Sequence, residues 1–306
     1  MLPRPLRKQL TVGYLVLRVS DYLEDNSAMS AAAKTSALDL WAAVLEARAD
    51  ADELEELLDD SPSDSIPDFH AARAAGRIAA SLGRLPPRAR ELIVRHTVAT
   101  TRGMARWVER GPDFADLDDL DDYMHEVAGR VGHLVTSLAA LRWQGVCRDL
   151  EERMRLAREF GLGLQTVNVL RGLSSDRDRG WIFVPRSMLP PGMAPSSIFD
   201  EAHRETAVSA VLELADKAEA HLEGALAWVT SLPLSATRLK IAFVMPLLFG
   251  ARTLALCRER PGEVVDGTVK MTRSEVTALV RKTLALGWSN AWVRGKTRGL
   301  LRPRPS

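Results

Sequence analysis

The sequence has few of the residues that support several common kinds of structure. Its 306 residues include two cysteines, three tyrosines and seven phenylalanines. Cys147 and Cys257 lie far apart and form no Cys-x-x-Cys pair, which argues against a disulfide framework and a cysteine-based zinc site. We expect both cysteines to be core residues.

An excess of charge of either sign is also missing. The chain has 41 Lys and Arg residues against 40 Asp and Glu residues, which gives a formal net charge of +1. Proteins bind nucleic acids mainly by neutralising backbone phosphates with Lys and Arg. The balance therefore predicts no nucleic-acid partner.

No apolar run approaches the roughly 20 residues that a membrane-spanning helix needs. The longest uncharged apolar stretch, residues 241–251, contains Pro246 and lies between Lys240 and Arg252. We interpret it as a buried helix and predict no membrane span. The first residues are positively charged but lack the apolar core of a secretory signal, so we expect a cytoplasmic protein.

Alanine, leucine and arginine are abundant, and apolar residues recur at three- and four-residue spacing. This pattern predicts an all-α protein. We expect helices over residues 10–25, 31–58, 68–82, 88–109, 117–142, 150–173, 203–232, 236–258 and 274–294. Breaks rich in Pro or Gly, such as residues 61–67 and 187–195, are too short to be domain linkers. We therefore predict one domain over residues 1–306.

The first pattern that suggests chemistry is an apolar helix ending in three carboxylates. Asp21, Glu24 and Asp25 share one helical face, and Arg18 lies one turn earlier. Such carboxylates repel each other by about 1 kcal/mol per pair in water and about 4 kcal/mol near a protein surface, so a compensating cation is needed. Mg²⁺ suits them, because it takes carboxylates, waters and phosphate oxygens. The alternative is a solvated acidic face, although acidic residues at a helix C-terminus oppose the helix dipole.

The second pattern lies in residues 161–185. Gln165, Asn168, Gly172 and Asp176 fall on one helical face, with Arg171 beside it. Polar groups inside an apolar helix are costly unless they are hydrogen-bonded or line a wet cavity. A hydrogen-bonded Asn at a helix contact is the alternative.

Two other acidic runs have simpler explanations. The carboxylates of residues 113–122 precede a helix, where they cap its N-terminus and favour its dipole. The acidic residues within 50–60 are predicted to form the exposed side of an amphipathic helix, with Leu54, Leu57 and Leu58 facing inward.

Several segments resemble the squalene and phytoene synthase family. Tyr14 to Asp25 resembles its first aspartate-rich motif, and Gln165 to Pro185 resembles its second. Residues 120–132 are similar to its Tyr-x-x-x-Val-Ala-Gly-x-Val-Gly helix. Residues 250–257 and 269–273 are similar to a later segment that ends in a Lys-rich patch. These landmarks follow the family's order and approximate spacing.

The resemblance implies a single isoprenoid-synthase helical domain around a central cavity, in which two acidic motifs hold Mg²⁺ against diphosphates. Such enzymes join two farnesyl diphosphates head to head through presqualene diphosphate to squalene with NADPH. Others join two geranylgeranyl diphosphates to phytoene without reduction. It also implies a prenyl diphosphate substrate and peripheral membrane contact for product release.

The resemblance assigns roles to residues that match family positions. The metal ligands are Asp21, Glu24, Asp25 and Asp176. The catalytic residues are Tyr123, Asp21, Asp25 and Asp176, with Tyr123 associated with the first half-reaction. The substrate-binding residues are Tyr14, Arg18, Gln165, Asn168, Arg171 and Lys270, with Lys270 at a position associated with the reductant.

The sequence also departs from the family. Gly172 and Ser175 replace two acidic residues of the second motif, leaving Asp176 with Asp178 nearby, which should weaken a second metal site. Glu126 replaces a tyrosine and Thr272 replaces an arginine, and the family's Ser-x-Ser/Thr-Phe helix is not found before Tyr14. Two alternatives therefore stay open. One is a terpene cyclase or prenyltransferase that ionises a single prenyl diphosphate, and the other is a catalytically silent lipid-binding homologue.

Overall fold

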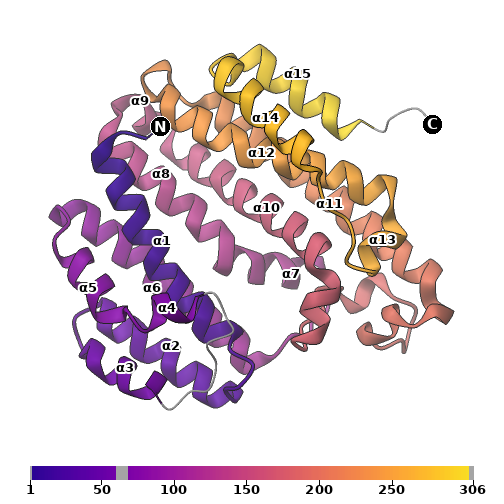
Figure 1. The fold of residues 1–306 in the computed structure, drawn as a ribbon, viewed down its shortest axis with the longest axis horizontal. Helices are drawn as coiled ribbons and strands as arrows, with labels where there is room; N and C mark the ends of the chain where they lie inside the picture. The colour runs from indigo at the N-terminus through magenta and orange to yellow at the C-terminus, as the bar shows by residue number, and fades with distance from the viewer. Residues whose placement is uncertain (1, 60–67, 303–306) are drawn as a thin grey trace. The chain divides into compact units, whose positions relative to one another are not determined.

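The computed structural model describes residues 2–59 and 68–302, and these residues form helices with no strand among them (Figure 1). The prediction of an all-α fold is confirmed. The contacts divide into two compact units. The N-terminal unit comprises Pro3–Pro112 and His133–Arg142, and the C-terminal unit comprises Asp113–Gly132 and residues from 143 onward. That residues 1–306 form one domain stays a prediction.

The helices of the N-terminal unit begin at residues suited to helix starts. Proline occupies the first turn of α1 and of α6, where its missing N–H costs nothing. The Ser30 side chain accepts a hydrogen bond from Ala33 N–H at 3.2 Å and caps α2. The helices are α1 (Arg4–Asp25), α2 (Ala31–Leu45), α3 (Ala51–Asp59), α4 (Phe69–Ala72), α5 (Ala75–Gly83) and α6 (Pro87–Arg110), joined by the C-terminal part of α8 (Arg130–Arg142).

The core of the N-terminal unit is built around α1, which packs against α2 and α6. Its buried face includes Val16, Val19 and Leu23. The Trp41 indole N–H of α2 donates to the Val16 carbonyl at 3.2 Å, and the Ser20 and Thr101 hydroxyls lie 2.8 Å apart between α1 and α6. These contacts fix the rotation of α1 and therefore the direction of its acidic end.

Two predicted helices of this unit are each two helices. Residues 68–82 divide into α4 and α5 at a turn over residues 73–74. Residues 31–58 divide into α2 and α3 because Ala47 adopts a left-handed conformation with φ 57°. The Arg48 N–H then bonds back to the Ala43 carbonyl at 2.8 Å, which satisfies the helix end. In α3, Leu54 and Leu58 are buried, as the amphipathic pattern predicts. The predicted break at residues 61–67, and residue 60, lie outside the described residues.

The C-terminal unit is centred on three long helices that pack on one another, α10 (Leu150–Asp178), α11 (Arg204–Ser231) and α12 (Thr237–Glu259). Its other elements are α7 (Leu117–Met124), the π-helix η1 (His125–Gly129), the start of α8, α9 (Gln144–Cys147), α13 (Pro261–Val265), α14 (Arg273–Leu286) and α15 (Asn290–Leu301). Short 3-10 turns are η2 (Arg186–Met188), η3 (Pro195–Phe199), η4 (Glu201–His203) and η5 (Leu234–Ala236).

Helix α12 contains the apolar stretch singled out in the sequence. Residues Leu234–Glu259 are long and apolar enough by composition to cross a membrane, and they are the one such segment among the described residues. However, 67% of the most apolar window is buried inside the protein, which is the burial of a core helix. The predicted buried helix is therefore present.

Two predictions in this unit are wrong. Residues 274–294 form two helices, because the chain turns at residues 287–289 and Ser289 caps α15, where its side chain accepts from Trp292 N–H at 3.3 Å. Cys147 is exposed in the short helix α9 and is not a core residue. Cys257 is buried as predicted, and burial raises the pKa of its thiol to about 11.

Candidate functional site

The first acidic motif lies at the C-terminal end of α1, within the N-terminal unit. The Arg18 guanidinium lies between two carboxylates: its Nη1 is 3.2 Å from Asp21 Oδ2, and its Nε donates to Asp68 Oδ1 at 2.6 Å. Its Cζ also lies 5.8 Å from the centre of the Tyr14 ring, which is exposed. The structure therefore brings Tyr14, Arg18 and Asp21 together and adds Asp68.

The carboxylates of this motif are crowded. Burial, together with the nearby charges of Asp25 and Asp68, raises the pKa of Asp21 to about 7, although Arg18 opposes the shift. A carboxyl group whose pKa is raised by neighbouring carboxylates would be stabilised in its ionised form by a bound cation. The donor set at this end of α1 therefore fits Mg²⁺ chemically.

The end of α1 is held by its own hydrogen bonds. Glu24 is buried, and its backbone carbonyl accepts a hydrogen bond from Lys34 Nζ at 2.7 Å. The buried Asn26 donates from Nδ2 to the Tyr22 hydroxyl at 3.1 Å and accepts from Ala28 N–H at the same distance. The carboxylates thus project from a fixed helix terminus rather than from a loose one. Among residues 2–59 and 68–302, no three His, Cys, Asp or Glu side chains already converge as a metal site.

The second motif lies on α10, within the C-terminal unit. Asn168 and Arg171 line a pocket of about 230 Å³ between α10 and α12, and Arg171 Nη2 donates to Asn168 Oδ1 at 2.9 Å. The remaining wall is mostly apolar and includes Leu164, Val167, Pro246, Phe249 and Met271. The polar pair is therefore set at the edge of an apolar pocket. Gln165 is half-buried on the same helix and is not among the lining residues.

The acidic end of this motif is neutralised by arginines of its own helix turn. Asp176 is buried, and its Oδ1 accepts from Arg179 Nη2 at 2.6 Å. Asp178 is exposed and pairs with Arg177 at 2.8 Å. With Gly172 and Ser175 in place of carboxylates, this segment does not fit a magnesium cluster.

Lys270 lies in the extended segment before α14, next to the pocket residue Met271. The same segment approaches α10 at Gly267, where an added Cβ would lie 3.0 Å from Ser174 Cβ. Thr272 has a structural role: it accepts from Glu275 N–H at 3.2 Å, and Glu275 accepts from Thr272 N–H at 2.9 Å, which forms a capping box for α14.

Tyr123 belongs to a buried aromatic cluster. Its ring centre lies 5.8 Å from Phe114, 5.3 Å from Phe183 and 5.4 Å from Trp181. Phe183 and Trp181 come from the segment that follows α10. The cluster therefore joins the middle motif to the end of the second motif, inside the C-terminal unit.

Glu126 is buried one turn after Tyr123, in the π-helix η1. Its carboxylate accepts two hydrogen bonds from Arg130, at 2.5 and 2.9 Å. The carboxylate that replaces a family tyrosine is therefore paired with a cation one helical turn away. π-helical segments often occur at functional sites, where they redirect side chains.

Gly132 of the middle motif and Gly161 of α10 allow α10 to cross η1 and α8 closely. A Cβ on Gly161 would lie 2.4 Å from the Ala128 carbonyl oxygen, and one on Gly132 would lie 2.1 Å from the Ala157 carbonyl oxygen. No side chain fits at these distances. The glycines of the Val-Ala-Gly-x-Val-Gly pattern thus allow the close helix crossing that places η1 against α10.

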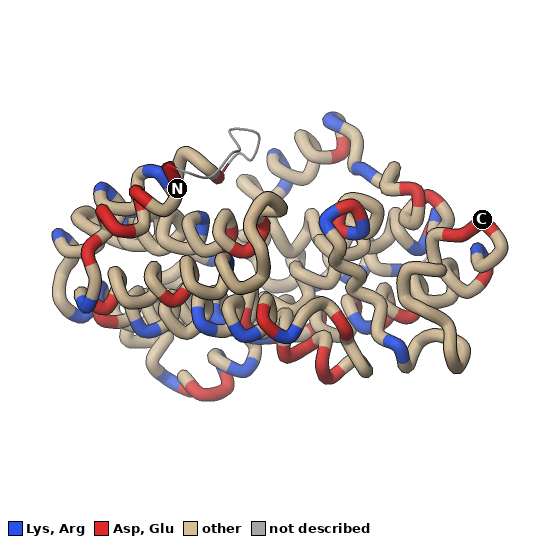
Figure 2. The backbone as a smooth tube through the Cα atoms, turned by 90° about the horizontal axis from the view of Figure 1, so that it is seen from below, with Lys and Arg blue, Asp and Glu red and all other residues tan. Residues whose placement is uncertain are grey.

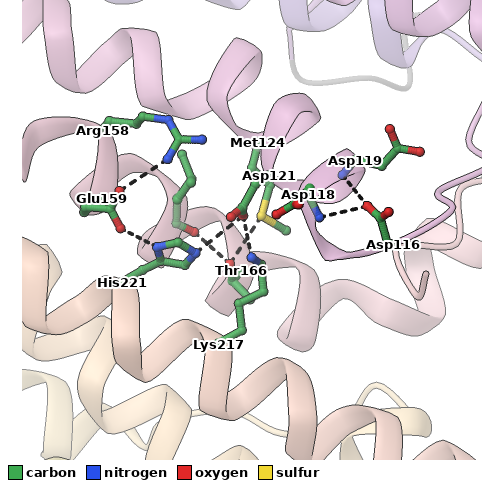
Figure 3. A network of polar contacts seen from close by, with 11 residues as sticks. Asp116, Asp118, Asp119, Asp121, Met124, Arg158, Glu159, Thr166, Lys217 and His221 are labelled. Carbon is green, nitrogen blue, oxygen red and sulfur yellow. Dashed lines mark hydrogen bonds and ion pairs between the residues drawn. The ribbon is translucent and has the colours of Figure 1, made fainter. Parts of the chain in front are cut away.

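A charged network joins α7, α10 and α11 next to this crossing (Figure 3). His221 Nδ1 lies 2.6 Å from Glu159 Oε2, its Nε2 lies 3.4 Å from Asp121 Oδ1, and Lys217 Nζ lies 2.6 Å from the same oxygen. Although burial opposes it, hydrogen bonding to Asp121 and Glu159 raises the pKa of His221. Asp121 therefore belongs to an ion network, while Asp116 caps α7 as the acidic run predicts, accepting from Asp118 and Asp119 N–H at 3.0 Å.

Sequence reasoning missed several partners of the candidate residues. Arg179 and Arg130 follow their acidic partners by three and four residues, a spacing that signals helical ion pairs. Asp68, by contrast, is separated from Arg18 by 50 residues, and no sequence pattern connects the two.

Comparisons with known proteins give a consistent result. The family model described as squalene/phytoene synthase matches residues 1–275. The squalene synthase of Solanum lycopersicum is 28% identical over 92% of this chain and 65% of its own length, and that of Yarrowia lipolytica is 25% identical over 90% and 60%. The chain thus spans about two thirds or less of these curated relatives.

Solved structures share the fold. A ligand complex of TcSQS has a TM-score of 0.78 and 21% identity, covering 100% of this chain and 87% of that one. The squalene synthase HpnC from Alicyclobacillus acidocaldarius has a TM-score of 0.57 and 22% identity, covering 86% of each chain. With the family match over residues 1–275 and the motifs in place, the chain belongs to the squalene/phytoene synthase family.

Proposed function

We propose that the protein is a magnesium-dependent prenyltransferase of the squalene synthase type, which condenses two farnesyl diphosphates head to head through presqualene diphosphate to squalene with NADPH. The single observation that carries the proposal is the first motif. Its crowded Asp21, Asp25 and Asp68 fit a cation, and Arg18 supplies a phosphate-binding group beside them. The curated relatives that support the choice of product are squalene synthases.

A bound Mg²⁺ would stabilise negative charge on a departing diphosphate. In this proposal Asp21, Glu24 and Asp25 hold the ion. Arg18 exchanges a carboxylate partner for phosphate oxygens, because guanidinium binds both in the same forked geometry. Tyr14 packs beside Arg18 and limits its movement.

The C-terminal unit, taken by itself, also has groups that would suit a prenyl diphosphate. Asn168 and Arg171 present polar groups at the rim of an apolar pocket, an arrangement that suits a molecule with an anionic head and a hydrocarbon tail. Tyr123 lies in a buried aromatic cluster, and in this proposal those rings would shield a carbocation from water. Lys270 is proposed to contact NADPH.

The test is incubation of the purified protein with Mg²⁺ and farnesyl or geranylgeranyl diphosphate, with and without NADPH. Diphosphate release and extracted hydrocarbons are measured for the parent and for Asp21→Asn. We expect squalene from farnesyl diphosphate and a loss of about 100-fold or more in the variant. Phytoene from geranylgeranyl diphosphate would change the assigned substrate, and no diphosphate release would overturn the proposal.

A second candidate is favoured by the second motif. Asp176 is already paired with Arg179, and Gly172 and Ser175 offer no carboxylate, so only the first motif fits a metal-bound diphosphate. An enzyme that ionises one prenyl diphosphate, as a terpene cyclase or single-substrate prenyltransferase, would need no more. Fifteen-carbon products without any thirty-carbon product would decide for this candidate.

A further inference from the structure

The C-terminal helices have a charge that the rest of the chain does not share. Residues 276–306 contain seven of the 41 Lys and Arg residues and none of the 40 Asp and Glu residues. In most of the chain the two signs are interspersed (Figure 2). Six of the seven cations lie in the described part of this segment, on or next to α14 and α15. The segment is therefore strongly cationic within a protein of nearly zero net charge.

The same segment exposes large apolar side chains. Leu284 is 48% exposed, Leu286 is 40% exposed and Trp288 is 55% exposed. Helix α14 packs on α12 (Figure 1), and within α14 only Leu279 and Thr283 are buried. Most of its surface is thus turned outward.

Cations and apolar side chains alternate on this outer surface. Arg281 precedes Leu284 by three residues, and Lys282 precedes Leu286 by four, so each cation is a helical neighbour of an exposed leucine. Neither cation forms an ion pair with any described residue. This arrangement lets the long side chains place their charge at a headgroup while the leucines enter the apolar layer.

Hydrogen bonds hold the turn between α14 and α15 in place. Asn290, at the start of α15, donates to the Thr230 carbonyl at 3.0 Å and accepts from Lys240 Nζ at 2.7 Å. These bonds hold the turn that carries Trp288 beside the connection between α11 and α12. That connection carries Leu234, which is 80% exposed.

A buried cation lies next to the start of α15. Lys240 is buried with an amide as its hydrogen-bond partner, and burial, followed by the charge of Arg294, lowers its pKa. Arg298 of α15, by contrast, is paired with Glu223 of α11 at 3.4 Å, so among the described residues the unpaired cations of the surface are those of α14. An apolar, tryptophan-bearing and cationic surface is the signature of helices that bind the interface of an anionic bilayer.

We propose that α14, its turn to α15 and the adjacent η5 form a docking surface for membranes that contain anionic phospholipids. Anionic headgroups contact Arg281 and Lys282, while Trp288, Leu284 and Leu234 enter the interface. The surface does not depend on the proposed catalysis. Because vesicle binding is measured without substrate, either proposal can fail while the other stands.

The test is cosedimentation of the purified protein with vesicles of phosphatidylglycerol and phosphatidylcholine in equal parts, and with vesicles of phosphatidylcholine alone. We expect binding to the anionic vesicles that weakens with added salt. The double variant Arg281→Gln/Lys282→Gln should bind about 30-fold more weakly, because each cation near an anionic surface contributes about a fivefold factor. Trp288→Ala should bind about tenfold more weakly.

Matched controls lie elsewhere in the chain. Arg7 and Lys8 are an exposed Arg-Lys pair in α1, so Arg7→Gln/Lys8→Gln makes the same change of charge on a helix outside the proposed surface. Leu284→Ser should weaken binding as Trp288→Ala does, and Leu212, which is 38% exposed on α11, gives the matched control Leu212→Ser. Circular dichroism and thermal melting confirm that each variant is folded.

The controls should bind vesicles like the parent. Equal losses for both charge pairs would show that only net charge matters and would overturn the proposed surface. No binding to either vesicle type would also overturn it. Binding to a duplex DNA fragment but not to vesicles, lost in Arg281→Gln/Lys282→Gln, would replace it with a polyanion site.

Discussion

At the scale of single residues, Asp21 shows a conflict between stability and function. Because its pKa is raised to about 7, the folded protein favours the protonated form more than the unfolded chain does. Its contribution to stability is therefore greatest below about pH 4 and is lost as the pH rises toward 7. A loss of folding stability on ionisation of one carboxyl group is typical of a residue that is kept for binding.

We therefore expect Asp21→Asn to raise the free energy of unfolding by about 1–2 kcal/mol at pH 8 and to change it little at pH 4. Urea denaturation at the two pH values measures the difference. Mg²⁺ should raise the melting temperature of the parent at pH 8 more than that of the variant, because it binds the folded carboxylates. A variant that is less stable than the parent at pH 8 would contradict the proposed electrostatics.

Ala47 offers a test of backbone strain. Its φ of 57° costs an alanine about 1–2 kcal/mol, whereas glycine adopts it freely. Ala47→Gly should therefore stabilise the protein by about 0.5 kcal/mol after the entropy lost by glycine is counted. Ala79→Gly, inside helix α5, is the matched control and should destabilise by about 1 kcal/mol in the same denaturation experiment. If both variants lose stability equally, Ala47 is not strained.

The sequence predicted single residues well where their partners are local. The face shared by Arg18 and Asp21 follows from helical spacing, and the structure places the two side chains 3.2 Å apart. Asp68 could not be predicted, because its contact with Arg18 depends on tertiary packing across 50 residues. The metal ligands and the catalytic roles stay predictions.

At the scale of elements, the crossing of η1 and α8 with α10 depends on glycine. Gly161→Ala would place a Cβ 2.4 Å from the Ala128 carbonyl oxygen, so the helices must separate. We expect a loss of about 3 kcal/mol in unfolding free energy. Gly295→Ala on α15, where nothing lies within 4 Å of the added Cβ, should instead gain about 0.5–1 kcal/mol. Thermal melting of the two variants distinguishes a packing role from simple helix propensity.

The network of Asp121, Glu159, Lys217 and His221 should make the docking of α7 depend on pH. The raised pKa of His221 gives stability that is present below about pH 6.5 and lost as the pH rises through its folded pKa. The lowered pKa values of Asp121 and Glu159 give stability that is lost as the pH falls below about 4. The network therefore stabilises most between these limits.

We expect His221→Gln to lower the free energy of unfolding at pH 5.5 by about 1–3 kcal/mol, because Asp121 and Glu159 lose a charged partner. The difference from the parent should shrink by pH 9. His203→Gln, at an exposed histidine, is the control for the substitution itself. A difference that does not change with pH would show that His221 acts only by packing.

Helix periodicity predicted where most elements lie but not where long ones break. Residues 31–58 and 274–294 keep an apolar pattern through their turns, so periodicity alone joins them. The helices are interrupted by the backbone conformation of Ala47 and of the turn before Ser289. Neither break has a glycine in the left-handed conformation, which is the usual sign of a helix end in a sequence. The π-helix η1 is likewise invisible to a test for 3.6-residue spacing.

At the scale of the whole molecule, the net charge of the chain hides the charge of its C-terminal segment. A net charge of +1 argued against a nucleic-acid partner and indicated no other, yet residues 276–306 contain only cationic charged residues. The family motifs, by contrast, could be recognised in the sequence, because four landmarks in order and at approximate spacing are more specific than overall composition. The fold could therefore be predicted from the motifs, whereas the cationic surface required knowledge of which side chains are exposed.

The complete reaction can be tested by its stoichiometry. Squalene formation releases one diphosphate for each farnesyl chain consumed, because both diphosphates leave. A reaction that stops at presqualene diphosphate releases one for every two chains. With Mg²⁺ and NADPH we expect one diphosphate per chain and a thirty-carbon product, measured by diphosphate assay and gas chromatography of the same samples.

The weakened second motif makes this ratio informative. If Asp176, paired with Arg179, cannot support loss of the second diphosphate, the ratio falls to one for every two chains and presqualene diphosphate accumulates. The variant Gly172→Asp/Ser175→Glu, which restores both missing carboxylates, should then raise the ratio. A ratio of one diphosphate per chain with only fifteen-carbon products would instead assign the enzyme to single-substrate chemistry, because no second prenyl group would have been joined.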